Sequence, residues 1–264
     1  MSWWEPYNCE TRITRLVLAC LLGLHVQAAQ PVLVELFTSE GCSSCPPADL
    51  LLQRLERGQF VPGVPVIALS EHVDYWNHLG WSDPFSSAQI TSRQQGYAVR
   101  FPKHGPYTPQ MVVDGAEEFV GSDVEQARRA IAQAANRQKL EVTIELVSPG
   151  KLHVAAPSNP AAAEVWLAVV YDPTPSAVAR GENSGRRLTH ISVVKSLKRV
   201  GEISRKKPLD IQVAVPTGTE RDGSLPNERV VVFVQERGQG RVLGSSEVSV
   251  RQSAGMVARW SPQK

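Results

Sequence analysis

Hydrophobic residues in the first half of the chain form two short continuous runs with a helically spaced segment between them. Residues 31–37 and 64–70 are nearly continuously apolar, which is typical of parallel strands covered on both faces. The segment 47–57 has helical spacing and ends at Gly58, which easily adopts the left-handed cap conformation. The pattern predicts a right-handed strand–helix–strand unit whose loops gather at the C-terminal strand ends.

The pattern predicts further helices and a hairpin in the same half. Residues 86–99 are expected to form a second helix, and residues 108–115 a strand that ends in an Asp-Gly turn. Residues 117–120 are the hairpin partner of that strand. A capping box formed by Ser122 and Glu125 begins a third helix with an apolar face. Together these elements predict an α/β domain.

The second half has a different pattern. Residues 140–147 alternate strictly between apolar and polar, as in a half-buried antiparallel strand. Further strands are expected at 151–155, 164–171, 189–200, 209–215, 229–235 and 241–250. Their number and spacing are typical of a β-sandwich, so we expect a second, all-β domain over residues 140–252. The polar loop 172–187 either borders a functional site or is a plain connection, and we favour the plain connection.

The N-terminus has the features of an export signal. Arg12 and Arg15 precede an apolar run, residues 16–26, that is too short to cross a bilayer comfortably. Small residues follow up to Ala28, where a signal peptidase would cut. The sequence therefore predicts a signal peptide over residues 1–28 and a periplasmic or secreted mature chain without a membrane span; a retained anchor is the alternative.

Composition limits the class of protein. With 264 residues, 42% hydrophobic and 20% charged, the chain is globular and long enough for one large or two ordinary domains. A net charge of +2, without a basic stripe interleaved with aromatic residues, argues against a nucleic-acid binder.

Four cysteines become two once the signal is removed. Cys9 and Cys20 leave with it, and the mature chain keeps Cys42 and Cys45. One Cys-x-x-Cys pair cannot form a four-cysteine zinc site, and it closes too small a loop to be an effective structural cross-link. Outside the cytosol such a pair is better interpreted as exchangeable. The pair precedes a helix N-terminus, where backbone N–H groups and the helix dipole favour a thiolate.

Residues 31–138 resemble the thioredoxin superfamily, through Cys42 and Cys45 after the first strand and Thr108-Pro109 before a later one. The resemblance implies a thioredoxin-like domain with a cis proline, Pro109, beside the dithiol. It also implies that the Thr108 backbone pairs with an extended substrate chain.

The whole mature chain also resembles a family of exported bacterial proteins, domain of unknown function 1223. The matching segments are residues 37–49, 72–76, 80–85, 107–110 and 180–183. The resemblance implies fold and export, and it brings no reaction. We expect Tyr107 and Trp76, which stand in these segments, to contact a substrate together with Thr108.

The chain departs from the thioredoxin pattern near the dithiol. Pro46 follows Cys45 and biases it away from helical angles, so we expect the helix to begin a residue or two late. Glu35 interrupts the apolar strand seven residues before Cys42, close to where thioredoxins keep a buried acid that helps the resolving thiol. Glu35 is either this functional acid or an ordinary ion-paired glutamate.

The sequence thus predicts an exported thiol–disulfide oxidoreductase. The more exposed Cys42 attacks a disulfide of a partner protein, Cys45 resolves the mixed disulfide, and the Cys42–Cys45 disulfide takes the place of a cofactor. One alternative is a protein that binds or delivers copper or another soft metal through Cys42, Cys45 and His72. A second is a non-enzymatic binding module in which the disulfide is structural.

Overall fold

The computed structural model describes residues 1, 30–58, 60–102, 105–173, 175–215 and 228–250. The predicted signal peptide, with its cleavage near Ala28, lies outside these residues apart from Met1. Residues 251 and 252, the last of the second predicted domain, also lie outside them.

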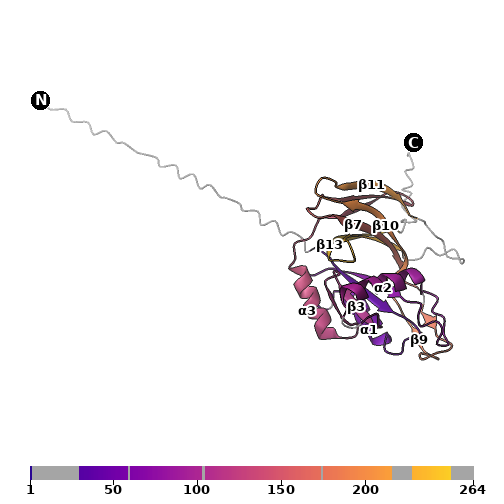
Figure 1. Cartoon of the computed structure of the whole chain (residues 1–264). Helices are drawn as coiled ribbons and strands as arrows, with labels where there is room; N and C mark the ends of the chain where they lie inside the picture. Colours follow the sequence, from indigo (N-terminus) through magenta and orange to yellow (C-terminus); the bar gives the residue numbers. More distant parts are fainter. Residues whose placement is uncertain (2–29, 59, 103–104, 174, 216–227, 251–264) are drawn as a thin grey trace, which may run out of the picture.

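The described chain contains three helices and thirteen strands (Figure 1). The helices are α1 (Pro46–Glu56), α2 (Ala88–Arg100) and α3 (Val124–Ala135). The strands are β1 (Val32–Thr38), β2 (Val66–His72), β3 (Gln110–Val113), β4 (Glu117–Val120), β5 (Thr143–Ser148), β6 (Lys151–Ala156), β7 (Ala163–Tyr171), β8 (Ser176–Ala177), β9 (Arg187–Leu188), β10 (Val193–Ile203), β11 (Leu209–Ala214), β12 (Arg229–Glu236) and β13 (Val242–Ser249).

A mixed eight-stranded sheet runs through the described part of the molecule in the order β13-β12-β7-β10-β2-β1-β3-β4. The predicted β1–α1–β2 unit is confirmed, because β1 and β2 pair in parallel with Val32 opposite Val66. β3 and β4 form the predicted hairpin and pair antiparallel to β1 through β3.

Strand β1 is covered on both faces, as its apolar run predicts. Val34 and Leu36 pack with α1 and α3, whereas Leu33 and Phe37 pack with α2 and with strands from the second half. The alternation of side chains along a strand separates these two cores. It also decides that Glu35 shares the α2 face and not the α1 face.

The sheet continues across the expected domain boundary near residue 139. β10 pairs in parallel with β2, with Val193 opposite Ser70, and β7, β12 and β13 extend the sheet from there. An alternating pattern predicts that a segment is a strand, but not which edge it joins. The two predicted segments therefore share one sheet, and the fold is a mixed α/β fold.

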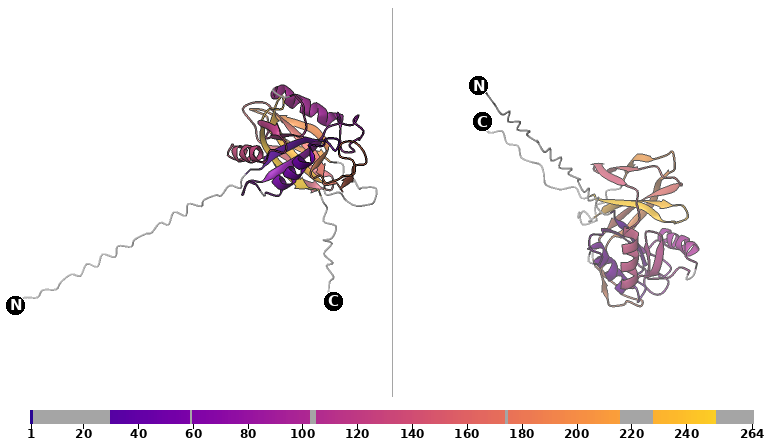
Figure 2. Two further views of the ribbon diagram at one scale, coloured as in Figure 1. Left: turned by 90° about the horizontal axis from the view of Figure 1, so that it is seen from below. Right: turned by 90° about the vertical axis from the view of Figure 1, so that its left-hand side faces the viewer.

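A separate three-stranded sheet, in the order β11-β6-β5, covers one face of the extension (Figure 1). Its residues Leu152 and Val154 pack in a third core with Leu167 of β7 and Val232 of β12. The three-stranded sheet therefore packs against strands of the eight-stranded sheet. Figure 2 shows the helices gathered at one end of the molecule and the added strands at the other.

Two helix starts differ from the prediction. Cys45 has helical angles (φ −77°, ψ −38°), and α1 begins at once with Pro46. The expected delay is wrong, because proline is preorganised for the first helical position. α3 is capped by Asp123, whose side chain accepts the Gln126 N–H at 2.9 Å, and not by Ser122.

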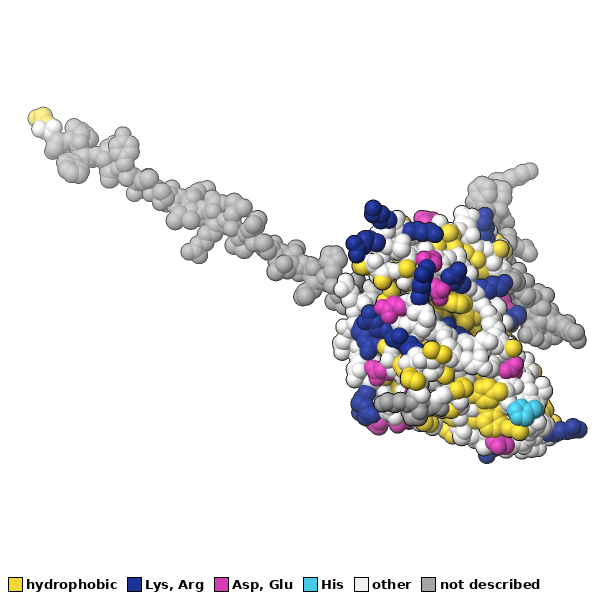
Figure 3. All heavy atoms as spheres, viewed as in Figure 1, with side chains coloured by type: hydrophobic (Ala, Val, Ile, Leu, Met, Phe, Trp, Pro, Cys, Tyr) yellow, Lys and Arg dark blue, Asp and Glu magenta, His cyan; other side chains and the backbone are white. Residues whose placement is uncertain are grey.

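No helix in the described ranges is long and apolar enough to span a membrane. On the face drawn in Figure 3, basic and acidic side chains are interspersed, while apolar side chains gather in the lower part of the molecule. Figure 1, in the same view, places the helices there.

Candidate functional site

Cys42 and Cys45 form a disulfide at the junction between β1 and α1, with their Cα atoms 5.4 Å apart. The Cys45 N–H donates to the Cys42 carbonyl oxygen at 3.2 Å and closes the turn. Both cysteines are 0% exposed, although Ser43 and Ser44 between them face solvent. The expectation that Cys42 is the more exposed thiol is therefore wrong, and a substrate reaches sulfur only when neighbouring side chains move.

Trp76 is one of these neighbours. It packs so closely on the turn that a Cβ added at Gly41 would lie 3.0 Å from the Trp76 Cβ. Its indole Nε1–H donates to Thr108 Oγ1 at 2.8 Å. The structure thus places Trp76 against the cysteine turn and joins it to Thr108.

The Thr108–Pro109 peptide bond is cis, as the resemblance implied. A Cβ added at Gly121 would lie 3.1 Å from the Pro109 Cβ and 3.2 Å from the Ala48 Cβ, so Pro109 lies beside the first turn of α1. Tyr107 is turned toward β4, where its hydroxyl donates to Glu118.

The loop between β7 and β10 holds the cysteine turn in place. Asn183 is 0% exposed, and its side-chain amide donates to the carbonyl oxygens of Glu40 at 2.9 Å and Cys42 at 2.8 Å. Glu182 accepts the Ser43 N–H at 3.0 Å, and the hydrogen bonds from Ser43 lower the pKa of Glu182. The interpretation of 172–187 as a plain connection is therefore wrong.

Glu35 is not brought to the disulfide. Its carboxylate lies 2.6 Å from the Arg93 guanidinium and accepts the Tyr97 hydroxyl at 2.5 Å, on the face of β1 that packs against α2. Arg93 also lies 3.5 Å from Glu71. Burial, and then the charge of Glu35, raise the pKa of Glu71 well above its ordinary value. The geometry of Glu35 is that of a buried ion-paired glutamate.

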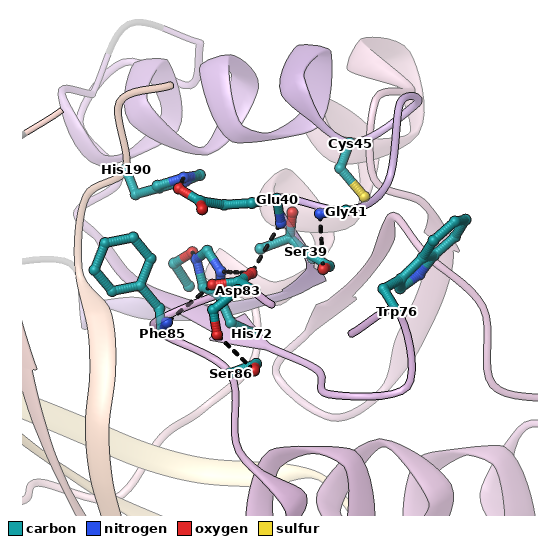
Figure 4. Close-up of polar contacts among 12 residues, drawn as sticks. Ser39, Glu40, Gly41, Cys45, His72, Trp76, Asp83, Phe85, Ser86 and His190 are labelled. Atoms are coloured by element: carbon teal, nitrogen blue, oxygen red, sulfur yellow. Dashed lines mark hydrogen bonds and ion pairs between the residues drawn. The ribbon is translucent and has the colours of Figure 1, made fainter. Parts of the chain in front are cut away.

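A cluster of buried titratable side chains lies near the cysteine turn, and Figure 4 labels four of them, Glu40, His72, Asp83 and His190. We call it the acid–histidine cluster; each member is at most 7% exposed, and its members are Glu40, Asp49, His72, Asp83 and His190. Taking so many charged groups out of water is costly unless they pair with one another.

The two histidines of the acid–histidine cluster each contact carboxylates. His72 Nδ1 lies 2.8 Å from Asp83 Oδ2. His190 lies between two carboxylates, with Nε2 3.3 Å from Glu40 Oε1 and Nδ1 3.8 Å from Asp49 Oδ2. The two imidazole rings meet edge to face, with centroids 4.7 Å apart. The cluster therefore joins residues from both halves of the chain.

The carboxylates of the cluster differ in acidity. Burial raises the pKa of Asp49 to about 6, although His190 and a 2.9 Å hydrogen bond from Thr38 act in the opposite direction. Burial also raises the pKa of Asp83, but its contact with His72 and two backbone N–H groups outweigh this and lower that pKa overall. Of these two carboxyl groups, Asp49 has the pKa nearer to neutral pH.

Both ring nitrogens of His72 contact other side chains of the protein rather than the cysteine sulfurs. Its second ring nitrogen, Nε2, lies 3.2 Å from Ser70 Oγ. In the part of the chain that the structure describes, no three His, Cys, Asp or Glu side chains are placed to hold a metal ion. The predicted set of Cys42, Cys45 and His72 is therefore not assembled.

The sequence offers a signal for two members of the acid–histidine cluster, Glu40 and Asp49. Glu40 stands two residues before Cys42, and Asp49 follows Cys45 by four, the spacing that puts two side chains on one helix face. The contribution of His190 follows only from the pairing of β10 with β2, which no local pattern predicts.

The fold and this site define a mixed α/β protein with a Cys-x-x-Cys disulfide at a strand–helix junction. Residues 33–235 match the family described as protein of unknown function (DUF1223), and the chain belongs to that family. The predicted resemblance to it is confirmed.

Two solved structures are similar to the chain. The chain is similar to protein AGR_C_4864 from Agrobacterium tumefaciens, with 26% identity and a TM-score of 0.67 over 86% of this chain and 97% of that one. A second structure, HBP35 of Porphyromonas gingivalis, shares 12% identity, with a TM-score of 0.57 over 90% of this chain and 81% of that one. The second likeness concerns the fold alone. No curated protein matches the chain.

Proposed function

We propose that the protein is an exported thiol–disulfide exchange protein that uses Cys42 and Cys45. The observation that carries the proposal is the disulfide between them at the start of α1, within a turn that Trp76 and Asn183 hold from outside. A disulfide between residues three apart adds little loop-closure entropy, so its presence is better explained by exchange than by cross-linking.

We infer further that β1–β4 and the three helices form a thioredoxin-like unit. Two placements support this: the disulfide follows β1 at the start of α1, and Pro109 lies beside the same helix just before β3. The strands from the second half then extend the unit, and the 180–183 loop contributes to its site. Export through the signal at residues 1–28 supplies an oxidising compartment in which such a pair functions.

In the proposed reaction, the Cys42 thiolate attacks a substrate disulfide and forms a mixed disulfide. Ser44 Oγ, 3.4 Å from Cys42 Sγ, is placed to donate to the thiolate. Cys45 then attacks Cys42 Sγ, re-forms the internal disulfide and releases the substrate as a thiol. Thr108, freed from Trp76 when the indole moves aside, offers its backbone to the substrate chain.

The trapping of partners tests this order of events. A Cys45→Ser variant keeps the attacking thiol but cannot resolve, so it should accumulate mixed disulfides with a disulfide-bonded protein substrate. The matched Cys42→Ser variant should accumulate far fewer, as measured on non-reducing gels and by mass spectrometry after acid quenching.

Equal trapping by the two variants, or none by either, would contradict the proposal. No trapping by either variant would favour the binding module with a structural disulfide, for which the burial of both cysteines is the supporting observation.

A further inference from the structure

Asp49 lies one helical turn beyond Cys45. Its N–H donates to the Cys45 carbonyl oxygen at 3.1 Å, and Cys45 has helical angles. Side chains four residues apart on a helix have Cβ atoms about 5–6 Å apart. This separation lets a carboxylate reach the neighbouring thiol directly or through one water.

Asp49 also borders the surface. A hollow of about 350 Å³ opens beside α1, and its walls are Pro46, Asp49, Leu50 and residues 186–189. Asp49 itself is 7% exposed. A proton on its carboxyl group therefore has a path to solvent, whereas the sulfurs and the rest of the acid–histidine cluster lie further inside.

His190 gives Asp49 a partner from the other half of the chain. Its Nδ1 atom is buried without a hydrogen bond among the described residues, and it lies 3.8 Å from Asp49 Oδ2. At this distance the two groups interact electrostatically, and a small movement closes them into a hydrogen bond. His190 Nδ1 is therefore available for a hydrogen bond with the Asp49 carboxyl group.

We propose that Asp49, supported by His190, accepts the proton of the Cys45 thiol and returns it to solvent through the hollow beside α1. The proposal rests on the proposed function and adds the groups that carry its proton. It also gives the second half of the chain a part in the chemistry, because His190 precedes β10.

The substrate is a protein disulfide, R–S–S–R′. In the mixed disulfide Cys42–S–S–R, with R′–SH already released, the Asp49 carboxylate takes the proton from Cys45. The Cys45 thiolate then attacks Cys42 Sγ, the internal S–S bond forms, and the bond between Cys42 and R breaks. R–S⁻ leaves and takes a proton from Asp49 or water, so the cysteine pair loses two electrons and the substrate gains them.

Several groups set the charge felt by Asp49. Thr38 of β1 donates to it, and His190 faces it from the segment before β10. Glu40 and Asp83 act on it as like charges from the loops after β1 and β2. Arg186 and Arg187 line the same hollow. His190 and Thr38 thus oppose the effects of burial and of the two neighbouring carboxylates, and the pKa of Asp49 is about 6.

The decay of the mixed disulfide tests the proposal. Reduced protein is mixed with glutathione disulfide, quenched in acid at set times, and the glutathione adduct on Cys42 is quantified by mass spectrometry between pH 5 and pH 9. In the native chain we expect the decay rate to rise with pH and to level off above about 6.

In Asp49→Asn we expect decay about 10- to 100-fold slower at pH 7, because a general base is lost. In this variant the decay rate should continue to increase with pH until the Cys45 thiol itself ionises, at about pH 8.5. Asn fits the space of Asp and keeps an acceptor for Thr38, so the fold is retained. His190→Gln gives an independent test. His190 lowers the pKa of Asp49, so its loss should move the midpoint of the decay-rate profile to higher pH.

Glu56→Gln is the matched control, since Glu56 is on the same helix but pairs with Arg229 at the far end. Its profile should follow that of the native chain. A pH profile of Asp49→Asn that keeps the native midpoint would overturn the role of Asp49. If Cys45→Ser forms no adduct with glutathione disulfide at any pH, the proposed function itself fails. If that adduct forms but the decay rate of Asp49→Asn depends on pH as in the native chain, only the proton-transfer role of Asp49 is rejected.

Discussion

Replacing Asp49 with asparagine should stabilise the oxidised protein at neutral pH. Burial raises the pKa of Asp49 from 3.8 to about 6, so the folded protein binds this proton more tightly than the unfolded chain does. Stability therefore falls as pH rises through the interval between these two values and stays low above it. Asparagine resembles the protonated acid, so the stability of the variant should not fall over this pH interval.

The shift sets the size of the effect. Two pKa units correspond to about 3 kcal/mol, which is the upper limit of the gain at pH 8. The gain should shrink as pH falls below 6 and disappear below about 4, where aspartic acid is protonated in both states.

Urea unfolding of the oxidised native and variant proteins at several pH values measures this difference. Glu125→Gln, which alters an exposed carboxylate on α3, should change stability by less than about 0.5 kcal/mol throughout. A difference between Asp49→Asn and native protein that is the same at pH 4 and pH 8 would refute the reasoning, because it would mean that folding does not perturb this carboxyl group.

Three further substitutions test the surroundings of the disulfide. Asn183→Ala leaves the Glu40 carbonyl oxygen without its donor and removes one of the two donors to the Cys42 carbonyl oxygen, so it should cost about 1–3 kcal/mol in urea unfolding; no loss would mean that the loop does not hold the turn. Arg93→Met leaves Glu35 and Glu71 buried without their cation and should cost about 3–5 kcal/mol, measured as a lower midpoint; an unchanged midpoint would contradict the pairing. Trp76→Ala should speed reduction by dithiothreitol, and an unaltered rate would show that the indole does not cover the sulfurs.

Local patterns predicted the elements that depend on local causes. The apolar runs of β1 and β2, the helix between them and the β3–β4 hairpin follow from burial, spacing and turn residues, and the structure confirms them. The disulfide follows from the spacing of Cys42 and Cys45.

The sequence did not predict the features that depend on distant contacts. The shared sheet arises because β10 joins β2, and that choice of edge is a property of the whole packing. Asn183 and His190 reach the site only through this pairing. Glu35 was assigned by its distance along the chain from Cys42, whereas strand alternation places it on the opposite face, with Arg93.

The site therefore contains groups from both halves of the chain. The cysteine turn and Asp49 come from the β1–α1 junction, and the amide and imidazole that support them come from the loop before β10.

The reduction potential of the Cys42–Cys45 pair tests the central claim most directly. The native protein is equilibrated in redox buffers of defined potential, and the free thiols are quantified after acid quenching. We predict a reversible two-electron transition between about −270 and −120 mV, the range of exchange proteins. A pair that stays oxidised below about −300 mV, as structural disulfides do, would contradict the account.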